Sequence, residues 1–250
     1  MSRLRPMLAV LVSMAALTGV GCDGAPGKPH PGPEVVRPDH VLDFATLYGQ
    51  NCVACHGDNR QAGAAISLAN PVYLAVAGEA NLKNAIANGV PGKLMPPFSR
   101  SAGGMLTEEQ VDIVANGLVS AWGKPGLLEG KSPPPYKASL HPDAAAGAKV
   151  FSTYCAECHG ANGEGKPDDV KGSIVDPSFL ALVSDQNLRS FVIAGIPASH
   201  MPDWQAHDGQ PPMTDQEITD VVAWLGAHRQ SNAAPTEAPP SATKHQEPHS

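Results

Sequence analysis

Apolar residues recur at helical spacing in one stretch near the end of each half of the chain. One face carries Val111, Val114, Ala115 and Leu118 in the first stretch, and Ile218, Val221, Val222 and Leu225 in the second. Both stretches follow a capping box, Thr107-Glu108-Glu109-Gln110 in one and Thr214-Asp215-Gln216-Glu217 in the other. The flanking pairs Leu106/Val111 and Met213/Ile218 stand in hydrophobic-staple positions. Each half is therefore predicted to end in an amphipathic helix.

Two further helices are predicted in each half. A first helix is expected over residues 39–51 and again over 143–154. A middle helix is expected to begin at Ala80 and end at Gly89, with a second one from Ser184 to Gly195. The predicted fold class is all-α.

The two halves are copies of one unit. Asn81-Leu82-Lys83, Gly89-Val90-Pro91 and Met95-Pro96 align with Asn187-Leu188-Arg189, Gly195-Ile196-Pro197 and Met201-Pro202 at a constant offset of 106. We therefore expect domains over residues 39–122 and 143–229. A stiff, proline-containing linker is expected over residues 123–142 between them.

The ends of the chain have the composition of export and tether segments. Residues 1–21 hold two arginines and then an apolar run, which predicts a signal peptide. The stretch from Thr18 to Cys22 resembles a bacterial lipoprotein processing site, which implies lipidation of Cys22; the alternative is ordinary cleavage nearby, with Cys22 as a free thiol. Residues 22–38 are expected to form a Pro/Gly-rich tether, and residues 230–250 a disordered tail.

The charge of the chain is acidic. The net charge is −7, and it is −9 without residues 1–21, which carry two of the 17 basic residues and none of the 24 acidic ones. This balance argues against nucleic acid as a partner and favours a partner with a positive face. Aromatic residues make up only 5% of the chain, a thin supply of core for two domains.

Each copy contains one C-x-x-C-H motif: Cys52, Cys55 and His56 in the first, and Cys155, Cys158 and His159 in the second. This pattern is typical of c-type haem attachment, in which two thiols add to the porphyrin vinyl groups and the histidine binds iron. A zinc site, a redox dithiol and a disulfide are the alternatives, but structural zinc takes four ligands in a closed set. Two covalently bound haem c groups are therefore expected, and they would supply the missing apolar bulk.

The motifs and their surroundings resemble the class I cytochrome c fold, present twice. Gly147, Phe151 and Cys155 fall at steps of four, and a Gly-rich loop, a Met-Pro and a last helix follow. The chain as a whole resembles the small diheme cytochromes c of bacterial respiratory chains. The first copy departs from the pattern, with Phe44 at the glycine position and Tyr48 at the aromatic one, so its helices are expected to cross differently.

Met95 and Met201 are the candidates for the sixth iron ligand. They lie 39 and 42 residues after their histidines and are each followed by proline, as the axial methionine of the family often is. A buried core methionine is the alternative for each, and His200 is a rival ligand for the second iron.

The resemblance implies an electron-transfer protein, not an enzyme, in the periplasm or otherwise outside the cytoplasm and held at the membrane by lipid. It would carry single electrons from a quinol-oxidising complex or a dehydrogenase to a terminal oxidase or another acceptor. Two alternatives remain: a diheme redox enzyme, either peroxidase-like or thiosulfate-oxidising, and a dedicated cytochrome subunit of a larger complex. The enzyme would need one iron with a displaceable or different ligand.

Overall fold

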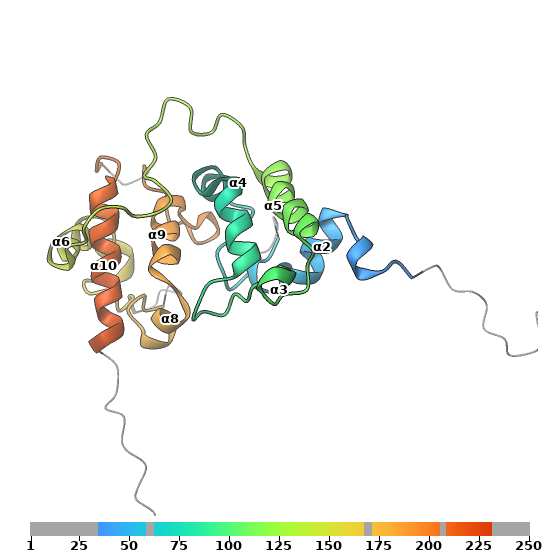
Figure 1. Cartoon of the computed structure of the whole chain (residues 1–250). Coiled ribbons are helices and arrows are strands. Elements are labelled where there is room, and N and C mark those ends of the chain that lie inside the picture. Colours follow the sequence, from blue (N-terminus) through green and yellow to red (C-terminus); the bar gives the residue numbers. More distant parts are fainter. Residues whose placement is uncertain (1–34, 59–62, 168–171, 206–208, 232–250) are drawn as a thin grey trace, which may run out of the picture. The chain divides into compact units, whose positions relative to one another are not determined.

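The computed structural model describes residues 35–58, 63–167, 172–205 and 209–231 (Figure 1). The expected signal peptide, Cys22, and most of the tether and tail lie outside these ranges. The chain divides into two units, Met1–His40 and Val41–Ser250, so both copies of the repeat belong almost wholly to the second unit. Within the described ranges, no helix is both long enough and apolar enough to cross a membrane.

The described residues confirm the all-α prediction. The first copy contains α2 (Phe44–Asn51), α3 (Val53–His56), α4 (Pro71–Asn88) and α5 (Glu108–Trp122). The second copy contains α6 (Ala144–Tyr154), α7 (Ala156–His159), α8 (Pro177–Leu182), α9 (Asp185–Ala194) and α10 (Asp215–Ser231). Two isolated β-bridges, Ser99 with Leu106 and Ile196 with Met201, are the only extended pairings in these ranges.

The first helix of the first copy begins later than expected. It starts at Phe44 instead of residue 39, because the carboxylate of Asp43 accepts a hydrogen bond from the backbone N–H of Thr46 at 2.8 Å and caps the helix there. In the second copy the expected helix over 143–154 is confirmed, with Asp143 as its cap. In the Met1–His40 unit, Pro38–His40 forms a single 3₁₀ turn.

The middle of each copy is more helical than expected. Gly78 interrupts α4 with a non-helical φ of 67° and ψ of 157°, so residues 71–77 form a separate helix ahead of the expected one. The second copy has the same pair as the separate helices α8 and α9. The missed signal was an N-cap residue followed by proline, Asn70-Pro71 and Asp176-Pro177.

The predicted last helices, α5 and α10, are confirmed in detail. Thr107 and Gln110 form the reciprocal hydrogen bonds of a capping box. The same exchange joins Thr214 and Glu217. The residues of the two predicted apolar faces are all at most 7% exposed. These faces are therefore the core side of each helix.

The first and last helices pack against each other in both copies, but the glycine and the large ring lie on opposite helices in the two copies. A Cβ atom on Gly147 of α6 would lie 2.0 Å from the carbonyl oxygen of Asp220 in α10, so only glycine fits there. Trp224 of α10 then reaches over this glycine and lies 4.2 Å, centroid to centroid, from Phe151. In the first copy, Phe44 of α2 supplies the large ring. The last helix there has a glycine, Gly117, whose Cβ would lie 2.1 Å from that ring.

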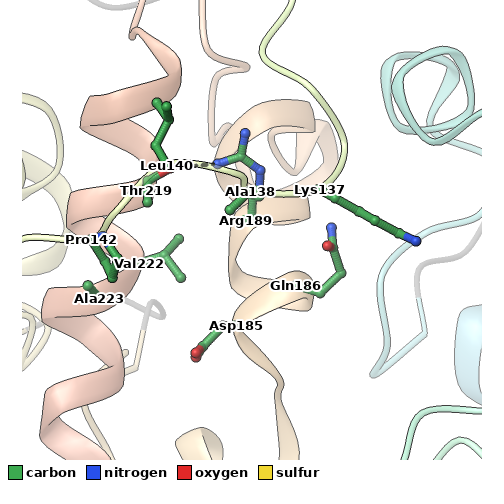
Figure 2. Close-up of a pocket in the computed structure, with 10 residues that line it drawn as sticks. All are labelled: Lys137, Ala138, Leu140, Pro142, Asp185, Gln186, Arg189, Thr219, Val222 and Ala223. Atoms are coloured by element: carbon green, nitrogen blue, oxygen red, sulfur yellow. Dashed lines mark hydrogen bonds between the residues drawn. The ribbon is translucent and has the colours of Figure 1, made fainter.

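The linker is fixed to the second copy by a buried arginine. Arg189 of α9 is 2% exposed, and its guanidinium donates to the carbonyl oxygens of Pro135 (2.8 Å) and Tyr136 (3.2 Å). It also pairs with Asp215 and donates to Thr219 of α10. This arginine lines a pocket of about 470 Å³. Figure 2 shows it between residues of the linker, α9 and α10. The linker thus packs against the protein and does not act as a free spacer.

Substituting Gly147 should destabilise the second copy. In Gly147→Ala the new Cβ atom meets a backbone oxygen that can move only with α10, so we expect a loss of about 1–3 kcal/mol in the free energy of unfolding. Gly49→Ala is the matched control: Gly49 is an exposed residue of α2 with nothing within 4 Å of its Cβ position, and alanine should stabilise the helix by about 0.5–1 kcal/mol. Denaturant titration of the haem-loaded protein measures both changes; equal effects would contradict the close helix contact.

Candidate cofactor-binding sites

Each C-x-x-C-H motif forms one short helical turn attached to the end of the first helix. The backbone N–H of Cys52 donates to Tyr48 and ends α2, and the same residue begins α3. Cys155 does the same between α6 and α7. Their dihedral angles agree closely, with φ/ψ of −121°/−37° and −122°/−34°. The two motifs therefore begin with the same backbone conformation at their first cysteine.

The four thiols differ in exposure in the same way in both copies. Cys52 and Cys155 are half-buried, Cys55 and Cys158 are exposed, and none is in a disulfide. Burial is the main cause that raises the pKa of the Cys52 thiol to about 11 and that of Cys155 to about 12. Redox dithiols and zinc ligands depend on thiolate, so a raised pKa favours neither. Residues 35–58, 63–167, 172–205 and 209–231 contain no group of three or more His, Cys, Asp or Glu arranged to hold a metal ion.

The imidazole of His56 is oriented by the backbone of its own copy. Its Nδ1 lies 2.7 Å from the carbonyl oxygen of Ile66, and because a carbonyl can only accept, Nδ1 is the protonated nitrogen. Burial lowers the pKa of His56, which favours the neutral ring. A neutral imidazole with Nδ1–H engaged has the Nε2 lone pair available for a metal. Ile66 could not be identified from the sequence, because it contributes through its backbone.

Tyr48 forms a hydrogen bond with Gly57, the residue that follows His56. The Tyr48 hydroxyl donates to the carbonyl oxygen of Gly57 at 2.5 Å. Burial raises the pKa of Tyr48, so the hydroxyl remains protonated and can donate. The equivalent residue in the second copy is Phe151, which has no hydroxyl. The phenylalanine-to-tyrosine change noted in the sequence therefore adds a hydrogen bond beside the first motif.

The two Met-Pro loops share one construction. Gly89 and Gly195 end the middle helices with φ of 64° and 66°. A Cβ on either glycine would lie 2.6–2.7 Å from the carbonyl oxygen of the methionine in its loop. Each loop is closed by a 3.0 Å hydrogen bond to that oxygen, from Val90 in the first copy and Ile196 in the second. The glycine thus brings each methionine back against the end of its helix.

The methionines lie in different surroundings. Met95 is half-buried and packs against the same core cluster as Cys52. Met201 is half-buried too, but the contacts described for it are those of its own loop. The rival His200 is exposed and has a left-handed φ of 57°. Met105 is 75% exposed and Met213 is 3% exposed in the core, which leaves Met95 and Met201 as the methionines in equivalent loops.

These residues fit a covalently attached haem in each copy. Each motif offers a pair of thiols and a histidine on one turn, and the methionine loop of its copy offers a thioether. The first copy shows the fit most directly, because Cys52 and Met95 contact one apolar core and His56 has Nε2 available. The linker pocket of Figure 2 is lined by none of these side chains.

Comparison with known proteins agrees with the repeat. A family model described as "Cytochrome C oxidase, cbb3-type, subunit III" matches residues 40–116 and 142–225. Each matched segment contains one C-x-x-C-H motif and one Met-Pro loop.

Three curated proteins illustrate the similarity. "Cbb3-type cytochrome c oxidase subunit CcoP" of Azospirillum sp. (strain B510) is 28% identical over 53% of this chain and 45% of its own length. "Cbb3-type cytochrome c oxidase subunit FixP" of Bradyrhizobium sp. (strain ORS 278) is 28% identical over 72% of this chain and 59% of its own. "Thiosulfate dehydrogenase" of Psychrobacter arcticus is 28% identical over 70% and 54%. The chain therefore spans about half to three fifths of the length of these relatives.

Proposed function

Because this chain belongs to the family described as "Cytochrome C oxidase, cbb3-type, subunit III" and is a diheme class I cytochrome c, we propose that it carries single electrons between protein partners outside the cytoplasm. The donor is a quinol-oxidising complex or a dehydrogenase, and the acceptor is a terminal oxidase or another redox protein. The observation that carries this proposal is the repetition in both copies of one set of groups: a C-x-x-C-H turn and a glycine-closed Met-Pro loop.

Eight residues hold the two haem c groups in this proposal. Cys52 and Cys55 would form the thioether bonds of the first haem, and His56 and Met95 would bind its iron. Cys155 and Cys158 would hold the second haem in the same way, with His159 and Met201 as the ligands of its iron. When bound, each haem supplies one iron that gains or loses a single electron.

The protein's own groups set the character of these sites. A neutral imidazole and a neutral thioether add no negative charge at the iron, which favours the reduced state and a high reduction potential. The Ile66 carbonyl holds the His56 ring, and Gly89 and Gly195 hold the methionine loops against the helices. With an imidazole and a thioether both bound to the iron, each site would suit transfer of electrons and not binding of a small substrate.

The names of the relatives support a partner in a respiratory membrane complex. Two of them are named as subunits of a cbb3-type oxidase, so a dedicated subunit role is as compatible with this chain as a free carrier. We further propose the domain limits 39–122 and 143–229, which nearly coincide with the matched segments 40–116 and 142–225. The acidic net charge favours a partner with a positive docking face.

Thiosulfate oxidation is the second candidate function, because one relative is named for it. Such an enzyme would need an iron whose sixth ligand differs or leaves. Both copies have a methionine in the same glycine-closed loop, which favours the carrier.

Loss of either methionine should change one haem only. Met95→Ala and Met201→Ala should each remove the weak near-infrared methionine-to-iron band of the haem in that copy, because the thioether that gives rise to it is gone. Met105→Ala is the matched control, since this side chain is 75% exposed and should leave both bands intact. An unaltered spectrum in Met95→Ala or Met201→Ala would remove that residue from the ligand set.

Carbon monoxide tests the carrier against the enzyme. The reduced native protein should not bind carbon monoxide without denaturant, because no coordination position is open. Met95→Ala and Met201→Ala serve as positive controls that open one position each. Ready binding by the wild-type protein, or turnover of peroxide or thiosulfate, would favour the enzyme.

We also propose that Cys22, which lies outside the described residues, carries the lipid that holds the protein at the membrane. Cys22→Ser should move the protein from the membrane fraction to the soluble extracytoplasmic fraction, as judged by fractionation and immunoblotting. Ala25→Ser, a similar change three residues along, should not. Persistent membrane association of Cys22→Ser would indicate that a protein partner, and not lipid, retains it.

A further inference from the structure

Asn70 joins the two copies of the repeat through a buried amide group. The residue is 6% exposed, and its side chain makes two kinds of contact. Its Oδ1 accepts from the backbone N–H groups of Val72 (2.9 Å) and Tyr73 (3.2 Å), which caps α4. Its Nδ2 donates to the carbonyl oxygens of Ala194 (3.0 Å) and Gly195 (3.2 Å), at the end of α9 in the second copy.

The repeat shows which of these contacts requires asparagine. At the equivalent position the second copy has Asp176, an exposed residue that caps α8 by accepting from Ser178 (2.8 Å) and Phe179 (3.1 Å). An aspartate serves equally well as a helix cap, but its carboxylate has no proton to donate. Asparagine is therefore needed at residue 70 for the contact with the other copy and not for the cap.

The two ends of this contact lie next to the candidate axial ligands. On the first side, Ile66 accepts the hydrogen bond of His56 only four residues before Asn70. On the second side, Gly195 is the residue that admits the methionine loop, since its Cβ would lie 2.6 Å from the Met201 oxygen. Asn70 thus connects the segment that orients His56 with the segment that carries Met201.

Apolar packing surrounds this amide on both sides. Val72 and Val76 of α4 pack against the core cluster of the second copy, while Phe191 and Ala194 of α9 pack against that of the first. A polar group in such a place is costly unless it is hydrogen-bonded, so the two bonds of Nδ2 fix the register in which the copies meet. A hydrogen bond from Lys93 to the carbonyl oxygen of Ala181 (2.7 Å) also joins the two copies, but it is exposed and therefore constrains their arrangement less.

We propose that Asn70 is a positioning residue for electron transfer between the two haems: it locks the His56 side of the first site to the Met201 loop of the second. The inference rests on the proposed ligands. In the step that this arrangement would serve, one electron would pass between the two haem irons, so that one is oxidised as the other is reduced and no bond is made or broken. Asn70 carries no charge in this step. It holds the separation and orientation across which the electron moves.

Asn70→Asp tests this role, because it keeps the cap oxygen and removes the donor. A flavin semiquinone made by a light flash adds one electron to the fully oxidised, haem-loaded protein, and re-equilibration between the haems is followed by absorbance. We expect the rate constant of this phase to fall by about tenfold, because both Nδ2 hydrogen bonds that hold the two copies together at this point are lost. Amide hydrogen exchange at Ile196 and Met201 should quicken by about tenfold as well.

Asp176→Asn is the matched control, since it makes the same exchange of side chains in reverse at the exposed cap and should leave both rates unchanged. Asn70→Ser, which also keeps a capping oxygen, repeats the test if the aspartate variant does not fold. An unchanged interhaem rate and unchanged exchange in a folded variant at residue 70 would overturn the proposal. Failure of the ligand assignment is a separate outcome. In that case the wild-type protein itself would lack the methionine-to-iron bands, before any substitution at residue 70.

Discussion

The packing of the first helix on the last helix is the constraint on which each copy depends, because the C-x-x-C-H turn is joined directly to the end of that first helix. Each copy fills this helix crossing with one large ring and one glycine. The second copy has glycine on the first helix and the ring, Trp224, on the last. The first copy reverses the arrangement with Phe44 and Gly117. In both copies the ring thus packs where the facing residue has no side chain, as a close-packed core requires.

The two copies are also tied to each other by polar groups that the apolar pattern does not reveal. Asn70 crosses from one copy to the other, and Arg189 holds the linker by its carbonyl oxygens. Both side chains are buried, so their value lies in the geometry they impose more than in net stability. The residues at the equivalent repeat positions lie at the surface, where Asp176 caps α8 and Lys83 pairs with Asp112, so the two copies differ at these positions.

The chemical character of the sites follows from the proposed neutral ligands, which lie on short, well-fixed segments. Backbone groups hold an imidazole in one copy and close a methionine loop in both. Such a site suits the proposed gain and loss of one electron, because little has to rearrange when the charge changes.

The sequence by itself determined the helical class, the tandem repeat, the attachment motifs and the capped last helices, since each depends on residues that are near neighbours along the chain. It also indicated the unusual Phe44 and Tyr48. Only the tertiary structure revealed Gly117 as the partner of Phe44, the Ile66 carbonyl as the partner of His56, and Asn70 as a bridge. These pairings join residues far apart in sequence or act through backbone atoms, which every residue shares. The local sequence pattern encodes neither kind of contact, so only the tertiary structure determines them.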